Sequence, residues 1–162
     1  MSSGKNILTL QQIAVKINRM VLIGLFDLII GILSITAGMG APAFITTIYG
    51  YGLLQIFGLL IGLFSIVAGI LSLLSGIGIP IAIIAEVYPP LTSLRGMQFF
   101  AAAKGALCLI SVILLFLGGT YTTYSMLYYL VLMLLDFGLA YYGGEVIRLI
   151  LRYVPAPLKL RF

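Results

Sequence analysis

The chain has 162 residues, of which 62% are hydrophobic and 8% are charged. A soluble domain carries about 25% charged residues, so this composition excludes a water-soluble fold, a disordered chain and, despite the excess of basic residues, a nucleic-acid-binding protein. The absence of histidine and the single cysteine exclude an imidazole metal site, Ser-His catalysis and an internal disulfide. We therefore expect an integral membrane protein that is not an enzyme and binds no metal, cofactor or nucleic acid.

Four apolar segments are long enough to cross a bilayer, which takes about 20 residues. They cover residues 20–39, 51–75, 97–117 and 124–144. The apolar stretch 80–87 is too short to span. We interpret it as a helical extension, or a short interfacial helix, that turns away at Pro80. The sequence thus predicts an all-α fold, a single domain built as a four-helix membrane bundle.

Residues 9–19, before the first span, have the pattern of an amphipathic helix. Ile13 and Ile17 share one face, whereas Lys16 and Arg19 lie on another. This pattern suits an N-terminal helix on the membrane surface, or alternatively an extension of the first span. At the other end, prolines terminate the last helix and leave residues 154–162 as a short basic tail.

The basic residues predict the orientation, because Lys and Arg in short loops resist translocation. The loops 40–50 and 119–123 contain no charged residue, whereas basic residues flank the opposite ends of the spans. Both termini and the middle loop should therefore face the cytosol, or the matrix or stroma in an organelle. The basic residues that we expect at this membrane surface are Lys16, Arg19, Arg95, Arg148 and Arg152.

The first two spans contain an internal repeat. Residues 22–42 and 60–80 are offset by 38 positions and agree at 12 of 21 positions, including four glycines and a proline. The connection between the copies is too short for another span, so the two helices should run antiparallel. Either a duplication of the segment or convergence of the two spans on one packing pattern explains the match between the copies.

Small residues recur at helical spacing in the spans, including a GxxxG motif. In lipid, small residues let helix backbones approach and gain van der Waals contact. They predict either packing inside the bundle or a stripe that docks a partner helix. The candidates are Gly24, Gly31 and Gly38 in the first span, Gly58, Gly62 and Gly69 in the second, and Ala140 and Gly144 in the fourth.

Three ionisable residues, Asp27, Lys104 and Asp136, fall within the spans. Placing such a residue near the bilayer centre costs at least about 2.5 kcal/mol of free energy, so its presence indicates a structural or functional role. Lys104 is expected to reach toward its interface or to pair with either aspartate. The set therefore has three interpretations: an internal structural pair, a site awaiting a cation on a partner subunit, or a proton relay. The scarcity of polar side chains in the second and third spans argues against a pore.

The middle of the chain has a recognisable layout. Glu86 follows an apolar helix, then come the pairs Pro89-Pro90 and Phe99-Phe100 around Arg95, and Lys104-Gly105 near the start of the third span. Over residues 58–118 this resembles the COPI-associated protein family, small Golgi tetraspan proteins linked to vesicle traffic. That family's third span commonly opens with Gly-Arg-Gly. The resemblance implies four spans, a Golgi location and no catalytic residues.

Together these features favour a non-enzymatic tetraspan protein that acts as a packing or scaffold component of a membrane assembly. Its expected partners are the lipid bilayer and other transmembrane subunits. One alternative is a supernumerary structural subunit of a respiratory, photosynthetic or ATP synthase complex in an organellar inner membrane. The other is a small proton-coupled transporter that uses Asp27 and Asp136.

Overall fold

Four long helices make up the fold. The computed structural model describes residues 3–36, 53–85, 87–117 and 123–153, with side chains described for residues 11–36, 56–85, 87–117 and 126–152. The helices are α1 (Ser3–Thr36), α2 (Leu53–Ile84), α3 (Leu91–Leu117) and α4 (Thr123–Tyr153). Each is long and apolar enough to cross a membrane, and the described residues contain no strand. The predicted all-α membrane protein with four candidate spans is confirmed.

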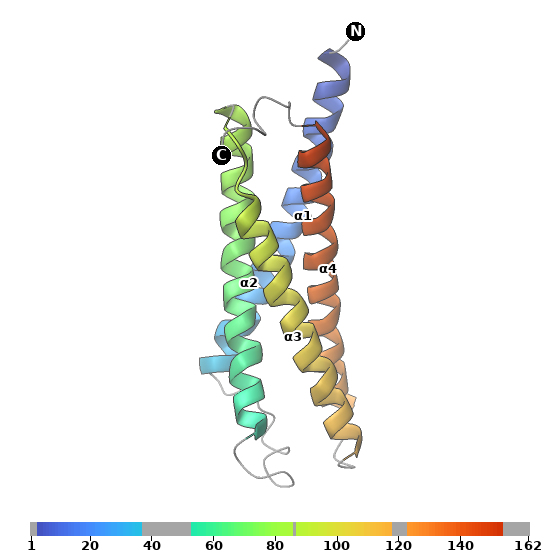
Figure 1. Cartoon of the computed structure of the whole chain (residues 1–162). Coiled ribbons are helices and arrows are strands. Elements are labelled where there is room, and N and C mark those ends of the chain that lie inside the picture. The colour runs from blue at the N-terminus through green and yellow to red at the C-terminus, as the bar shows by residue number, and fades with distance from the viewer. Residues whose placement is uncertain (1–2, 37–52, 86, 118–122, 154–162) are drawn as a thin grey trace.

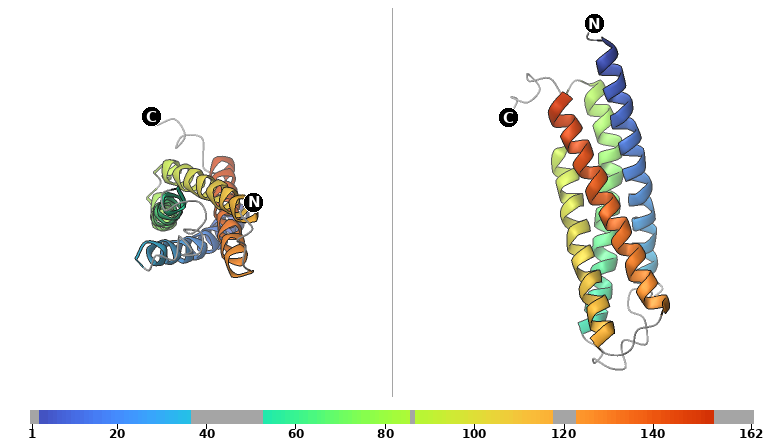
Figure 2. Two further views of the ribbon diagram at one scale, coloured as in Figure 1. Left: turned by 90° about the horizontal axis from the view of Figure 1, so that it is seen from below. Right: turned by 90° about the vertical axis from the view of Figure 1, so that its right-hand side faces the viewer.

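The helices pack as a ring in chain order. Contacts join α1 to α2, α2 to α3, α3 to α4, and α4 back to α1, so that α1 and α3 lie diagonally opposite each other (Figure 2). Neighbours in the chain run antiparallel, and α1 begins at the end of the bundle where α4 ends (Figure 1). The side of the membrane that this end faces stays a prediction.

Buried positions recur in steps of three and four residues along α1, α3 and α4. Because an α-helix has 3.6 residues per turn, this spacing places the buried residues in a narrow line along one face of the helix. Such a line is typical of helices that pack at a small crossing angle, as in a coiled coil. On α1 the buried positions are Ile13, Ile17, Met20, Gly24, Asp27, Gly31 and Ser34. On α3 they are Leu91, Leu94, Met97, Ala101, Lys104, Cys108, Ser111 and Leu115. Polar residues thus occupy seam positions that an ordinary bundle fills with apolar side chains.

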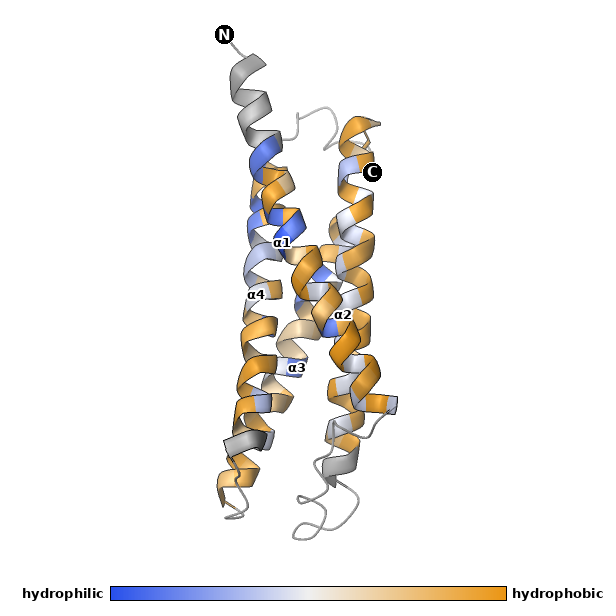
Figure 3. Ribbon diagram, turned by 180° about the vertical axis from the view of Figure 1, so that it is seen from behind, coloured by the Kyte–Doolittle hydropathy of each residue, from blue (hydrophilic) through white to orange (hydrophobic). Residues whose placement is uncertain are grey.

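The outer surface of the bundle is apolar. Orange, hydrophobic residues cover most of the helices in Figure 3. On α4, Leu134 and Phe137 are 71% and 72% exposed. A soluble protein rarely exposes apolar patches of this extent, whereas in a bilayer such side chains meet lipid tails. The surface therefore agrees with the membrane assignment.

The helices extend beyond the predicted spans. Residues 9–19 belong to the unbroken helix α1, so the continuous-helix interpretation holds in place of a separate surface helix. The reason is that Ile13 and Ile17 are buried in the same seam as the rest of α1. Helix α2 likewise continues through Pro80, so residues 80–84 extend the helix. Gly38 and the tail of residues 154–162 lie outside the described residues.

The two copies of the repeat pack against each other with matching contacts. A Cβ added at Gly31 would lie 2.8 Å from the Gly62 carbonyl oxygen, and one added at Gly69 would lie 2.7 Å from the Gly24 carbonyl oxygen. The 38-residue offset makes Gly24 equivalent to Gly62 and Gly31 equivalent to Gly69. The α1–α2 pair therefore has an approximate two-fold symmetry of contacts, with equivalent residues exchanging roles.

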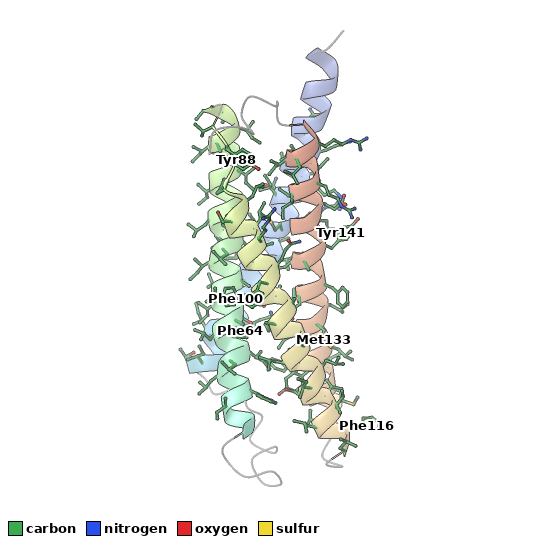
Figure 4. The ribbon with its side chains drawn as sticks, in the orientation of Figure 1. Phe64, Tyr88, Phe100, Phe116, Met133 and Tyr141 are labelled. Carbon is green, nitrogen blue, oxygen red and sulfur yellow. The ribbon has the colours of Figure 1, made fainter. Side chains whose placement is uncertain are left out.

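Polar and aromatic contacts join the other neighbouring helices. The rings of Phe64 on α2 and Phe100 on α3 have centroids 5.5 Å apart (Figure 4). The Ser75 and Ser93 hydroxyl oxygens, also on α2 and α3, lie 2.8 Å apart. Between α3 and α4, Gln98 donates a hydrogen bond to the carbonyl of Ala140 at 2.9 Å.

Candidate functional site

The three ionisable residues that the sequence places inside the membrane meet in one cluster, which we call the charged triad. The Lys104 ammonium contacts Asp27 Oδ1, and the Lys104 Nζ atom lies 2.7 Å from Asp136 Oδ1. Lys104 and Asp27 are fully buried, and Asp136 is 4% exposed. The sequence suggested that Lys104 would pair with one aspartate or reach toward the interface, and the structure instead places it between both.

The triad connects three helices. Asp27 lies on α1, Lys104 on α3 and Asp136 on α4, each at a buried seam position. Because α1 and α3 are diagonal in the ring, a long side chain is needed to join them, and lysine provides a four-carbon stem ending in three N–H donors. The triad thus links helices across the bundle where the backbones do not meet.

The triad also lies between two apolar clusters of the core. One cluster surrounds Met20, Met97 and Leu139 toward the end of the bundle where α1 begins. The other surrounds Ile61, Cys108 and Leu132 toward the opposite end. Water is thereby kept from the charges on both sides along the bundle axis. In such surroundings, a charge is tolerated only when it is paired.

The triad leaves acceptor oxygens without donors. In the part of the chain that the structure describes, Asp27 Oδ2 and Asp136 Oδ2 have no hydrogen-bond partner. Two carboxyl groups also share one ammonium group. The site is therefore held together by Lys104 but has capacity for a further hydrogen-bond donor or cation.

Among the small residues predicted for helix packing, the described glycines of α1 and α2 are buried, whereas Ala140 and Gly144 on α4 are partly exposed. Ser72 faces Gly24, and Gln98 lies against Gly144, at 3.2 Å from an added Cβ to Nε2. Gly58 is buried on α2. Sequence reasoning missed Gly138, where an added Cβ would lie 2.8 Å from Ile23 Cδ1, and Gly143 beside Met97. The three-and-four spacing of buried positions along α4 was the signal that points to Gly143.

Some of the predicted surface cations bind α4. Lys16 Nζ lies 3.3 Å from Glu145 Oε2, and its ammonium lies 5.5 Å from the centroid of the Tyr141 ring. Arg19 donates to the Tyr142 hydroxyl at 3.4 Å. These contacts attach the first turns of the α1 span to the last turns of α4, and Tyr141 is labelled in Figure 4.

The remaining predicted cations lie at the same end of the bundle. Arg148 pairs with Glu145 at 3.5 Å, the spacing of three residues that brings side chains together on one helix face. Arg95 on α3 and Arg152 on α4 are exposed. The basic residues therefore gather where α1 begins and α4 ends.

A groove opens between α3 and α4 beside the triad. Its volume is about 290 Å³, and small residues line much of it. Asp136 also lines the groove, and a Cβ added at Gly105 would lie 3.6 Å from Asp136 Oδ2. The floor of the groove therefore brings a carboxylate oxygen next to a residue without a side chain. The main small lining residues are Ala101, Ala102, Gly105, Ala106 and Ala140.

Comparison with family models, curated proteins and solved structures finds no match to this chain. Among the described residues, no group of three or more His, Cys, Asp or Glu side chains could hold a metal ion. The candidate site therefore consists of the charged triad and the groove beside it.

Proposed function

We propose that this protein is a non-enzymatic packing or scaffold component of a membrane assembly. The observation that supports the proposal is the charged triad, in which Lys104 joins Asp27 and Asp136 across three helices. All three side chains are buried, so the charges serve to hold the bundle together. The described outer surface is largely apolar, and it includes a groove that Asp136 lines.

The resemblance to the COPI-associated protein family supports a place in Golgi or vesicle membranes. Lys104 and Gly105 belong to the resembling segment, and here the first is the centre of the triad and the second lies in the groove. A structural subunit of an organellar inner-membrane complex has the same physical requirements, namely a compact bundle and a docking face. The identity of the co-purifying proteins separates the two locations.

The direct test is extraction in a gentle detergent, separation on a native gel and mass spectrometry of the band that contains this chain. We expect it to migrate with a larger complex of defined composition. Migration as a monomer, or as an oligomer of this chain alone, would overturn the scaffold proposal.

A second measurement tests transport through the two aspartates. The purified protein is reconstituted in liposomes with a pH gradient, beside Asp27→Asn and Asp136→Asn variants and protein-free vesicles. We expect no proton flux above that of protein-free vesicles. A flux that the native chain supports and Asp27→Asn abolishes, in a variant that still folds, would instead assign a transport function.

A further inference from the structure

We propose that the α3–α4 groove binds a transmembrane helix of another protein, and that this helix places one basic side chain against Asp136. The proposal rests on the scaffold function above and specifies the kind of partner.

The shape of the groove suits a helix. On α3 the lining residues Ala101 and Leu109 are eight residues apart, which corresponds to about 12 Å or two helical turns. Two pairs with small residues four positions apart, Ala101 with Gly105 and Ala102 with Ala106, lie along this face. Such spacing lets a second backbone approach closely in lipid, where small residues favour helix association.

An acceptor in the groove provides the second, independent observation. Asp136 is 96% buried, since only 4% of it is exposed, and its Oδ2 atom has no hydrogen-bond partner among the described residues. This side chain lines the groove. Leaving a buried carboxylate oxygen without a donor is unfavourable, so the groove floor favours an occupant that donates a hydrogen bond.

The composition of the triad favours a cation as the donor. The triad contains two carboxyl groups and one ammonium group, so a further lysine or arginine would donate to Asp136 and give each carboxyl group a cation of its own. Asp136 lies ten residues from Met126, the first residue of the α4 span, or about 15 Å along the helix. The partner side chain must therefore lie well inside its own span, where a basic residue is rare and needs a counter-ion.

Neither a second copy of this chain nor a lipid meets these requirements. Among the described residues, the one basic side chain at comparable depth is Lys104, which is fully buried in its own triad. An acyl chain would fill the apolar walls but would leave Asp136 Oδ2 without a donor. The observations therefore favour a helix from a different protein.

Site-specific photo-cross-linking in native membranes tests the proposal. A photoreactive phenylalanine replaces Leu109 in the groove wall or, as a matched control, Leu63 on α2, because both leucines are 48% exposed. We expect the probe at Leu109 to capture one membrane protein with a lysine or arginine inside a span, and the probe at Leu63 not to capture it. Replacing that partner residue by leucine should abolish the adduct.

A groove-filling variant separates docking from loss of the fold. Ala106→Leu places a large side chain in the groove and keeps all three residues of the triad, and Ala14→Leu adds the same bulk at an exposed position of α1. We expect the first to abolish the adduct from Leu109 and the second to leave it unchanged.

Several outcomes would overturn the inference. They are an adduct with lipid alone, with a second copy of this chain, or with a partner that has no basic residue in its span. If the chain still migrates in a larger complex, the scaffold function stands and the groove assignment fails. If the chain migrates alone and the groove captures only lipid, both fail.

Discussion

Lys104 carries an ammonium group within the membrane, where an unpaired charge costs at least about 2.5 kcal/mol of free energy. It is tolerated because two carboxyl groups from different helices contact it and because apolar clusters exclude water on either side. Removing Lys104 leaves two buried carboxyl groups with no cation between them, whereas removing one aspartate still leaves a Lys–Asp pair. Removing all three charged groups leaves no charge to compensate, so single and combined substitutions should differ sharply.

The first prediction concerns Lys104→Met. Because it leaves Asp27 and Asp136 facing each other, we expect it to lower the free energy of unfolding by about 3–5 kcal/mol. The triple variant Asp27→Asn, Lys104→Met, Asp136→Asn should recover most of this loss. Reversible unfolding in bicelles measures both. A triple variant as unstable as Lys104→Met would show that the triad contributes more than balanced charge.

At the scale of elements, the α1–α2 pair depends on the absence of side chains at its glycines. The backbones approach so closely that a Cβ added at Gly31 or Gly69 would lie within 2.8 Å of a carbonyl oxygen of the facing helix. Real Cβ atoms do not come this close to backbone, and a carbonyl in a packed helix cannot move away as a flexible side chain can.

The second prediction is that Gly31→Ala separates α1 from α2 and destabilises the bundle by about 1–3 kcal/mol, the usual cost of overpacking. Gly105→Ala is the matched control, because its added Cβ would lie 3.6 Å from Asp136 Oδ2, an ordinary contact distance. Thermal unfolding in detergent compares the two. Equal stability of the two variants would contradict the close approach of α1 and α2.

The sequence predicted the helices more fully than the contacts between them. The apolar runs identified four spans, and the repeated glycines marked one face of each of the first two helices but left open whether that face packs inside the bundle or against a partner. Spacing along one helix cannot tell which other helix a residue faces, so it did not reveal that Lys104 contacts both aspartates. It also did not reveal the groove at Gly105, because a groove depends on the distance between two helices. The continuity of α1 depended on Ile13 and Ile17 being buried by packing.

At the scale of the whole molecule, the charged residues divide the bundle into two unlike ends. Lys16, Arg19, Glu145 and Arg148 gather where α1 begins and α4 ends. Because basic residues resist translocation, this end should stay on the cytosolic side, or on the equivalent side in an organelle.

The third prediction tests that orientation with a membrane-impermeant maleimide on sealed membranes. With the reagent on the non-cytosolic side, Thr47→Cys in the uncharged loop should react directly and Lys159→Cys in the basic tail only after permeabilisation. Sealed vesicles whose cytosolic face is outward, such as Golgi vesicles, should give the opposite order. The native Cys108 serves as an internal control, because it is fully buried and should react only after denaturation. A pattern of labelling opposite to the one expected for the preparation used would show that the bundle is inverted.

The triad has a consequence for the order in which the protein is made. Asp27 and Lys104 are 77 residues apart in the chain. At about 5–20 residues per second, the ribosome adds Lys104 roughly 4–15 s after Asp27. Helix α2 ends at Ile84, so the first two helices are synthesised before the cation that contacts Asp27 in the folded bundle. These two helices must therefore wait, with Asp27 neutralised by a proton or held at the membrane surface, until the third helix is inserted. The bundle is then completed when α3 brings the Lys104 ammonium to Asp27. A chain that stops before residue 104 is expected to be a target for membrane quality control.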